Sequence, residues 1–137
     1  MQYQAKISRE DGVYIVTFPD LPDVNTYGET LDDALKNAGE ALNGALQADF
    51  GRGFTLPRPR PHKGRAYHAI PVAPHVAVAY QLRALRNGRS QSDIARTLGV
   101  SYQAVQKLEN PRSTNPSLKT LEKIAETFGK RLDVSFA

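Results

Sequence analysis

The sequence predicts an α+β chain, in which a small antiparallel sheet with one helix is followed by an all-α helix-turn-helix domain. Three observations predict this architecture. Apolar residues alternate with period two near the N-terminus, they recur at helical spacing after residue 30, and two short amphipathic helices flank a Gly-Val-Ser turn after residue 90. We expect the two domains to be residues 1–73 and 74–137.

Alternation predicts the first strands. In "YQAKI", Tyr3, Ala5 and Ile7 share one face, and "VYIVTF" alternates in the same way. The intervening "REDG" has the residues of a hairpin turn. Proline cannot occupy a central strand, so "FPDLPD" interrupts the pattern. We expect "VNTYG" to form a short third strand that ends at Gly28, and "YHAIPVA" to form the last strand of the sheet.

The segment "ETLDDALKNAGEALNGALQADFG" predicts one long helix, because its leucines and alanines recur at helical spacing. Thr30 is a suitable N-cap residue. We expect Gly39 and Gly44 to allow close packing on the sheet, and Gly51 and Gly53 to end the helix. The basic, proline-rich "LPRPRPHKGR" that follows is expected to be an extended connector that is merely solvated.

The second half is predicted to be helical up to its last residues. The expected elements are helices over residues 75–86, 91–98, 102–109 and 118–128, and a final strand in the alternating "RLDVSFA".

The stretch "SQSDIARTLGVSYQAVQKLEN" predicts a helix-turn-helix. Ser90 and Ser101 are expected to cap the two helices, and Gly99 to take the left-handed conformation of the turn. Ile94, Ala95, Leu98, Val105 and Leu108 would face inward. The outward face of the second helix then holds side chains of the kinds that read base edges in a major groove: Tyr102, Gln103, Gln106 and Lys107.

Residues 76–129 resemble the Xre/Cro phage-repressor type of helix-turn-helix, because the helix pair, the glycine turn and the trailing helix occur in order. The resemblance implies that Tyr102, Gln103 and Lys107 contact bases, and that Gln106 contacts bases or phosphates. The residues expected at phosphates are Gln91, Ser101, Asn110 and Arg112. One departure is Arg89, where the family usually has an apolar residue; we expect its stem to pack and its head to reach solvent.

Charge differs along the chain. Residues 1–56 carry a net charge of −5, residues 57–73 of +4 and residues 74–137 of +5. A basic second half suits nucleic acid, and an acidic first half suits a basic protein. The sequence has no cysteine, which excludes disulfides and fits a reducing compartment. No signal peptide or membrane-spanning run is recognisable, so we expect a cytoplasmic protein with no membrane partner.

The segment "GVYIVTFPDLPDVNTYGETLDDALKNAGEAL" resembles the HicB antitoxin family. The resemblance implies a partial RNase H-like fold and an antitoxin of a type II toxin–antitoxin module. Its first domain would cover the active site of a small basic HicA-like toxin that cleaves mRNA, and its second domain would repress its own operon. A single helix-turn-helix reads few bases, so we expect a homo-oligomer, a dimer or a tetramer, on an inverted-repeat operator.

Other functions fit these residues less well. A nuclease needs carboxylates that converge on metal ions. Helix capping explains Asp32 and Asp33, and turns beside prolines explain Asp20 and Asp23. The acids available here are Asp11, Asp20, Asp23, Glu29, Asp32, Asp33 and Glu40. The spacing of His62, His68 and His75 matches no metal-binding motif. We therefore predict no catalytic residues, no metal and no cofactor. The alternative from another class is a transcription regulator that senses a small ligand and has no toxin partner.

Overall fold

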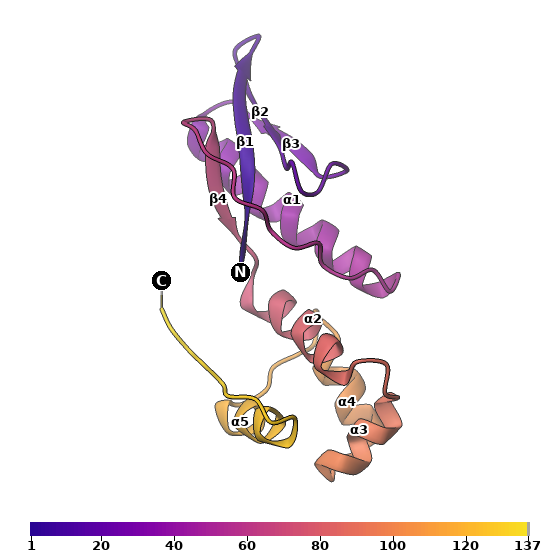
Figure 1. Cartoon of the computed structure of the whole chain (residues 1–137). Coiled ribbons are helices and arrows are strands. Elements are labelled where there is room, and N and C mark those ends of the chain that lie inside the picture. The colour runs from indigo at the N-terminus through magenta and orange to yellow at the C-terminus, as the bar shows by residue number, and fades with distance from the viewer. Residues whose placement is uncertain (137) are drawn as a thin grey trace. The chain divides into compact units, whose positions relative to one another are not determined.

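The computed structural model describes residues 1–136, which form two compact units (Figure 1). The first unit comprises Met1–Ala77, and the second begins at Val78. Helix α2 (Pro74–Arg86) starts in the first unit and continues into the second.

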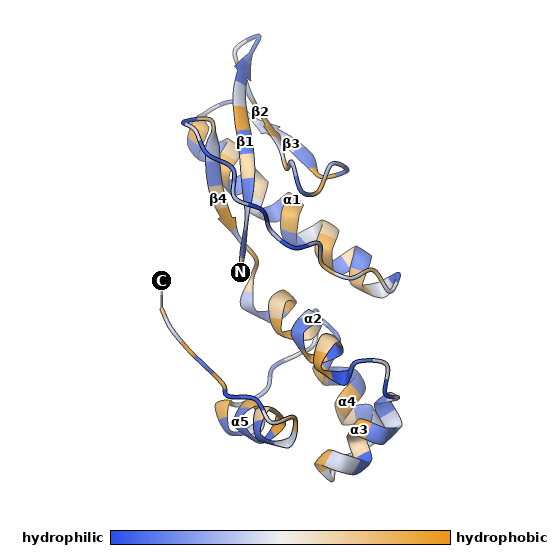
Figure 2. Ribbon diagram, viewed as in Figure 1, coloured by the Kyte–Doolittle hydropathy of each residue, from blue (hydrophilic) through white to orange (hydrophobic). Residues whose placement is uncertain are grey.

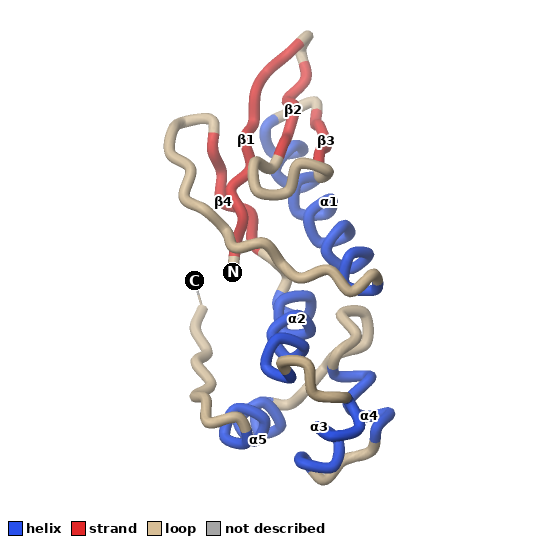
Figure 3. Tube along the Cα trace, turned by 45° about the vertical axis from the view of Figure 1, so that its right-hand side comes forward, coloured by secondary structure: helices blue, strands red, loops and turns tan. Residues whose placement is uncertain are grey.

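The first unit is a four-stranded antiparallel sheet with one helix. Strands β1 (Gln2–Glu10), β2 (Val13–Thr17), β3 (Asn25–Gly28) and β4 (Tyr67–Pro71) lie in the order β3-β2-β1-β4. Helix α1 (Leu31–Gly51) packs on this sheet (Figure 3). The predicted α+β architecture is confirmed, including the hairpin, whose turn has positive φ at Asp11 (49°) and Gly12 (81°), as a type I′ turn requires.

The core of the first unit lies between α1 and one face of the sheet. Tyr3 and Ala5 are fully buried and Ile7 is 7% exposed, so the predicted shared face of β1 is confirmed. Helix α1 contributes an equally buried stripe at helical spacing, Ala34, Ala38, Leu42 and Leu46. Thr30 caps the helix as predicted, since its Oγ1 accepts a hydrogen bond from the Asp33 backbone N–H at 3.0 Å.

The close approach of helix and sheet occurs at a different glycine from those predicted. A Cβ atom on Gly39 or Gly44 would meet nothing within 4 Å, so the expectation that these two glycines allow close packing is wrong. A Cβ on Gly28, by contrast, would lie 2.3 Å from the backbone nitrogen of Ala34. The first turn of α1 therefore rests directly on the end of β3, at a distance that only glycine permits.

The connector between α1 and β4 is anchored, and the expectation that it is merely solvated is wrong. Asp20, whose side chain is only 2% exposed, accepts hydrogen bonds from the backbone N–H of Arg60 at 2.9 Å and from its Nε at 2.8 Å. The Nε2 of His62 lies 3.2 Å from the same carboxylate. In addition, the Tyr3 hydroxyl donates to the carbonyl of Pro57 at 2.6 Å. These contacts lay the extended connector along the first unit.

The surroundings of Asp20 and Tyr3, the two side chains that anchor the connector, shift their pKa values. The backbone N–H of Arg60, followed by the Arg60 and His62 side chains, lowers the pKa of Asp20 to about 2 against the opposing effect of burial. Burial, with a smaller effect from the Asp20 charge, raises the pKa of Tyr3 to about 12. Because the folded-state pKa of Asp20 is lowered, its contribution to stability is present above pH 4 and is lost as the pH falls toward 2.

The second unit is helical, as predicted. After α2 come α3 (Gln91–Leu98), α4 (Tyr102–Leu108) and α5 (Leu118–Thr127). Its core consists of Ile94, Ala95, Leu98, Val105 and Ile124, against which Leu82, Leu85, Leu108 and Phe128 pack. Within the described residues, no helix is long and apolar enough to cross a membrane.

The final strand predicted in "RLDVSFA" is absent over residues 131–136, and Ala137 lies outside the described residues. Residues 130–136 have no regular secondary structure, and no strand within residues 1–136 pairs with them. Alternation alone does not make a strand, because the backbone N–H and C=O groups of a strand need a partner strand.

The contrast between glycines gives a test of the first unit. Gly28→Ala should destabilise the protein by about 1–3 kcal/mol, because the new methyl group would overlap the backbone of α1. Gly39→Ala is the matched control and should stabilise it by about 0.5–1 kcal/mol, since Ala has the higher helix propensity and open space lies beside it. Urea denaturation followed by circular dichroism measures both changes. Shifts of the same sign would contradict the close approach of α1 to β3.

Candidate nucleic-acid interface

Local hydrogen bonds shape the helix-turn-helix as the sequence predicts. The Oγ of Ser90 accepts from the Asp93 N–H at 3.0 Å, and the Oγ of Ser101 accepts from the Ala104 N–H at 3.1 Å. Between the helices, Gly99 is left-handed, with φ 69° and ψ 32°. The two helix starts and the turn are therefore confirmed.

Packing leaves one face of α4 in solvent. Val105 is 2% exposed and anchors α4 to the buried face of α3. The opposite face holds the predicted base-reading side chains, all of which are exposed: Tyr102, Gln103, Gln106 and Lys107. These hydrogen-bonding and cationic groups are thus presented together by one rigid helix.

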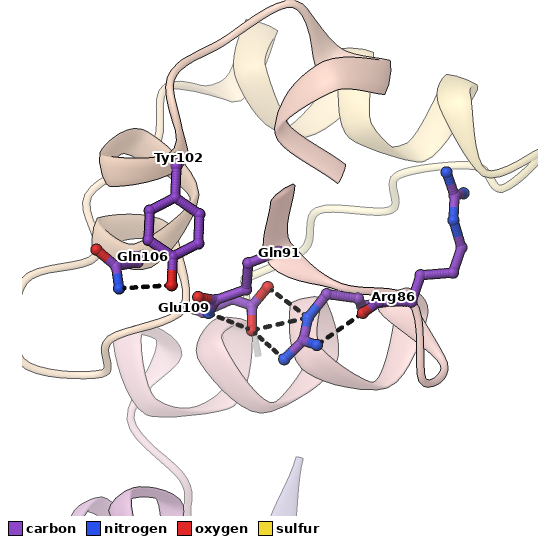
Figure 4. Close-up of polar contacts among 6 residues, drawn as sticks. Arg86, Gln91, Tyr102, Gln106 and Glu109 are labelled. Atoms are coloured by element: carbon purple, nitrogen blue, oxygen red, sulfur yellow. Dashed lines mark hydrogen bonds and ion pairs between the residues drawn. The ribbon is translucent and has the colours of Figure 1, made fainter. Parts of the chain in front are cut away.

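Two of these side chains are joined. The Nε2 of Gln106 donates a hydrogen bond to the Tyr102 hydroxyl at 3.0 Å, one helical turn away (Figure 4). The bond orients the phenol along the helix, although 43% of Tyr102 remains exposed. The hydroxyl hydrogen stays available to an external acceptor such as a base edge or a phosphate.

A buried carboxylate joins three helices behind this face. Glu109, at the end of α4, is only 5% exposed, and it accepts hydrogen bonds from the Nε of Arg86 at 3.0 Å and the Nη2 at 2.9 Å (Figure 4). The Nε2 of Gln91, the first residue of α3, donates to the same carboxylate at 3.3 Å. Arg86 also donates to the Arg89 carbonyl at 2.8 Å, which ties the α2–α3 loop to the network.

Sequence reasoning did not assign Arg86 or Glu109 to the site. A signal was present, because Glu109 follows the inward-facing Val105 by four residues, which places it on the inward face of α4. A carboxylate on an inward face requires a buried cationic or hydrogen-bonding partner.

The residues predicted to contact phosphates lie in different settings. Gln91 is half-buried and bonded to Glu109, whereas Ser101 is exposed and caps α4. The Oδ1 of Asn110 accepts from the Arg112 backbone N–H at 3.0 Å, so it shapes the turn after α4. This turn presents the exposed Arg112 near the end of the helix. Contact of these residues with phosphates stays a prediction.

Arg89 lies where an apolar residue was expected, and its head group is more engaged than predicted. Its Nη2 donates to Thr97 Oγ1 at 3.0 Å, and its guanidinium carbon lies 6.0 Å from the centre of the Phe128 ring. The residue as a whole stays exposed. It therefore covers the edge of the core and keeps a positive charge at the surface.

A metal site needs several acidic or histidine side chains grouped around one ion. Within residues 1–136, no three histidine, aspartate or glutamate side chains are grouped as ligands of one ion. Asp20 and His62 are partners of each other in the connector anchor.

An α+β unit joined to an exposed helix-turn-helix defines a two-part protein with a nucleic-acid-binding motif at its C-terminal end. Residues 2–78 match the family described as HicB-like antitoxin of bacterial toxin–antitoxin systems, and residues 80–134 match a helix-turn-helix family. The chain belongs to the HicB antitoxin family.

Two sequence relatives agree with this assignment. The chain is 31% identical to Antitoxin HicB 1 of Photorhabdus laumondii over 126 residues, which cover 92% of this chain and 80% of the relative. It is 28% identical to Antitoxin HicB 2 of the same organism, over 98% of this chain and 95% of the relative. The crystal structure of the N-terminal domain of Burkholderia pseudomallei antitoxin HicB aligns with a TM-score of 0.47 at 30% identity, covering 53% of this chain and 99% of that one.

The network around Glu109 can be tested by removing its carboxylate. Glu109→Ala should destabilise the second unit by about 3 kcal/mol, because it leaves the guanidinium of Arg86 without its anion in a largely buried position. Amide hydrogen exchange of residues 91–108 measures this loss locally. Glu122→Ala, which removes an exposed carboxylate from α5, is the control and should change exchange by less than about 0.5 kcal/mol. Equal exchange in the two variants would show that the network does not support α3 and α4.

Proposed function

We propose that this protein is the antitoxin of a type II toxin–antitoxin module, which binds and occludes a small HicA-like mRNA-cleaving toxin and represses its own operon. Membership of the HicB family supports the first activity, and the helix-turn-helix supports the second. The observation that carries the proposal is the union, in one chain, of an α+β unit whose residues 1–56 carry a net charge of −5 and an exposed, basic helix-turn-helix.

The division of labour follows the chain. We propose that residues 1–73 are the toxin-neutralising domain and residues 74–137 the DNA-binding domain, with the boundary at Pro74, where α2 begins. Both tasks act on nucleic acids or on a nuclease inside the cell, which agrees with a cytoplasmic location.

Toxin neutralisation requires no catalysis and no cofactor, because occlusion of an active site is sufficient. A toxin that binds RNA must carry positive charge. The net charge of −5 over residues 1–56, with exposed carboxylates at Glu29, Asp32 and Asp33 where α1 begins, would attract such a partner and speed the encounter.

Operator recognition is assigned to the outward face of α4. Tyr102, Gln103 and Lys107 would contact bases, Gln106 bases or phosphates, and Arg112 a phosphate beside the helix. Two copies related by a two-fold axis would place two such helices on an inverted repeat.

The proposed DNA contacts predict that two substitutions weaken DNA binding in different ways. Gln103→Ala should cost about 1–3 kcal/mol on the operator and little on random DNA, because it removes a base contact. Arg112→Ala should weaken binding to both DNAs and reduce the salt slope by about 1, because it removes a phosphate contact. Fluorescence anisotropy at several salt concentrations measures both. Lys123→Ala, an exposed cation of α5 outside this face, is the control. Equal loss on operator and random DNA for Gln103→Ala would contradict its role in base reading.

The toxin assignment predicts that the two halves separate the two activities. Coexpressed with the neighbouring reading frame, residues 1–73 should retain a small basic protein and residues 74–137 should not. Added salt should slow association with that protein and leave dissociation nearly unchanged, because charge acts mainly on the encounter. If residues 1–73 fold by circular dichroism but retain no basic protein, a ligand-sensing regulator becomes the better account; such a regulator would bind DNA alone and respond to a metabolite.

A further inference from the structure

The connector between α1 and β4 lies in a part of the chain without acidic residues. Residues 50–92 contain eight arginine or lysine residues and no aspartate or glutamate. Four of these cations are exposed residues of the connector, which is hydrophilic over most of its length (Figure 2): Arg58, Arg60, Lys63 and Arg65. Positive charge therefore gathers on one segment of the first unit as well as on the helix-turn-helix.

Prolines stiffen this segment. Pro57, Pro59 and Pro61 alternate with Arg58 and Arg60. Each proline fixes its own φ and restrains the residue before it to an extended conformation. The two arginines thus project from a stiff backbone, which loses little conformational entropy when the side chains bind a ligand.

Contacts with the sheet fix the path of the connector. Near its start, the Tyr3 hydroxyl donates to the carbonyl of Pro57 at 2.6 Å. Near its end, the rings of His62 and Tyr67 are stacked, with centroids 5.4 Å apart and 17° between their planes. The backbone N–H of Tyr67 also donates to the Gly64 carbonyl at 3.3 Å. The cations of the connector are therefore carried by a segment that is held on both sides of them.

Asp20 holds Arg60 by one edge of its guanidinium. The carboxylate accepts from the Arg60 backbone N–H and from Nε, and it is only 2% exposed, whereas the Arg60 side chain is 69% exposed. A guanidinium carries N–H groups on Nε, Nη1 and Nη2, and Asp20 engages the one on Nε. The terminal nitrogens of Arg60 are thus oriented for an external acceptor, and a phosphate fits them with two parallel hydrogen bonds.

The anchor leaves most of the connector's charge in solvent. Within residues 1–136, the ion pairs of the connector are those of Asp20 with Arg60 and His62, so its four cations exceed their one acidic partner by three charges. Fixed cations without exposed acids among them suit a polyanion, and duplex DNA carries one negative charge per about 1.7 Å of its axis. The same charge would repel a basic protein.

We propose that the connector is a second DNA-binding element, which holds the phosphate backbone of duplex DNA through four cations: Arg58, Arg60, Lys63 and Arg65. This inference goes beyond the proposed function, which assigns DNA contacts to the helix-turn-helix alone. Phosphate contacts carry no sequence information, so the connector adds affinity and salt dependence on any duplex, and the outward face of α4 selects the operator.

Neutralising the connector tests its contribution. In the full chain, Arg58→Gln, Lys63→Gln and Arg65→Gln together should weaken binding to random-sequence duplex DNA roughly tenfold or more. They should also lower the slope of log K against log salt by about 2–3, because each lost phosphate contact removes about 0.9. Arg60 is left in place because it anchors the connector. Fluorescence anisotropy at several salt concentrations measures both changes.

The control variant removes the same charge from other exposed positions, with Lys36→Gln, Lys123→Gln and Lys130→Gln. It should weaken binding by less than about threefold and change the salt slope by less than about 1, because these lysines are outside the proposed contacts. Circular dichroism checks that both variants fold.

Protection of a lysine locates the contact in the native chain. Saturating duplex DNA should slow acetylation of Lys63 by acetic anhydride roughly fivefold or more, whereas the exposed Lys36 of α1 should keep its rate within about twofold. Mass spectrometry measures both rates. The protection of Lys63 should persist when Lys107→Ala and Arg112→Ala remove two cations of the helix-turn-helix, because the connector binds phosphates independently.

Three results would overturn the proposal. The connector and control variants could weaken DNA binding equally, Lys63 could be acetylated as fast with duplex DNA as without it, or single-stranded RNA could protect Lys63 better than duplex DNA. The last result would identify an RNA-binding surface instead. Operator binding that still depends on Gln103 would leave the helix-turn-helix assignment in place in each case, so this inference fails separately from the proposed function.

Discussion

The arrangement of the DNA-binding unit depends on the buried carboxylate of Glu109. A unit of this size has a small apolar core, which leaves little area to set the angles between its helices. Glu109 receives hydrogen bonds from α2 through Arg86 and from α3 through Gln91, and it lies at the end of α4 itself. Since a buried carboxylate is costly unless its lone pairs are satisfied, the three helices stay together in the one arrangement that satisfies it.

The α+β unit is held by a backbone contact and by an anchored loop. Gly28 lets α1 rest on β3, at one edge of the sheet. The connector that leads to β4, at the opposite edge, is held by Asp20 through Arg60 and His62. The connector runs between α1 and β4, so these contacts reduce the entropy that an unanchored loop of this length would retain. The same contacts engage the guanidinium of Arg60 and the imidazole of His62 within the unit that carries them.

Charge separates the two proposed activities along the chain. The acidic start of α1 and the basic helix-turn-helix belong to different compact units. Within the DNA-binding unit, α4 and its C-cap contain a single acidic residue, Glu109, and its side chain points inward. The outward face of α4 carries only hydrogen-bonding and cationic side chains. This arrangement removes a like charge from the surface that would meet phosphate.

Local sequence is sufficient for the helices of this chain and for the outward face of α4, because the interactions that set them span few residues. Thr30, Ser90 and Ser101 each cap a helix by bonding a backbone N–H three residues on, and Gly99 turns the chain by its own conformation. Periodicity likewise separates buried from exposed positions within one helix or strand. Tertiary structure alone decides the close approach of α1 to the sheet, the anchoring of the connector and the pairing of strands, since these contacts join residues that are distant in the sequence. The sequence does not show that the first turn of α1 rests on Gly28, or that Gly39 within α1 has open space beside it. In the same way, Asp20 looks like a turn residue until the connector reaches it. The alternation of polar and apolar residues after α5 predicts a strand, but residues 130–136 do not form one. Strand formation requires backbone partners, and the rest of the described chain does not provide them.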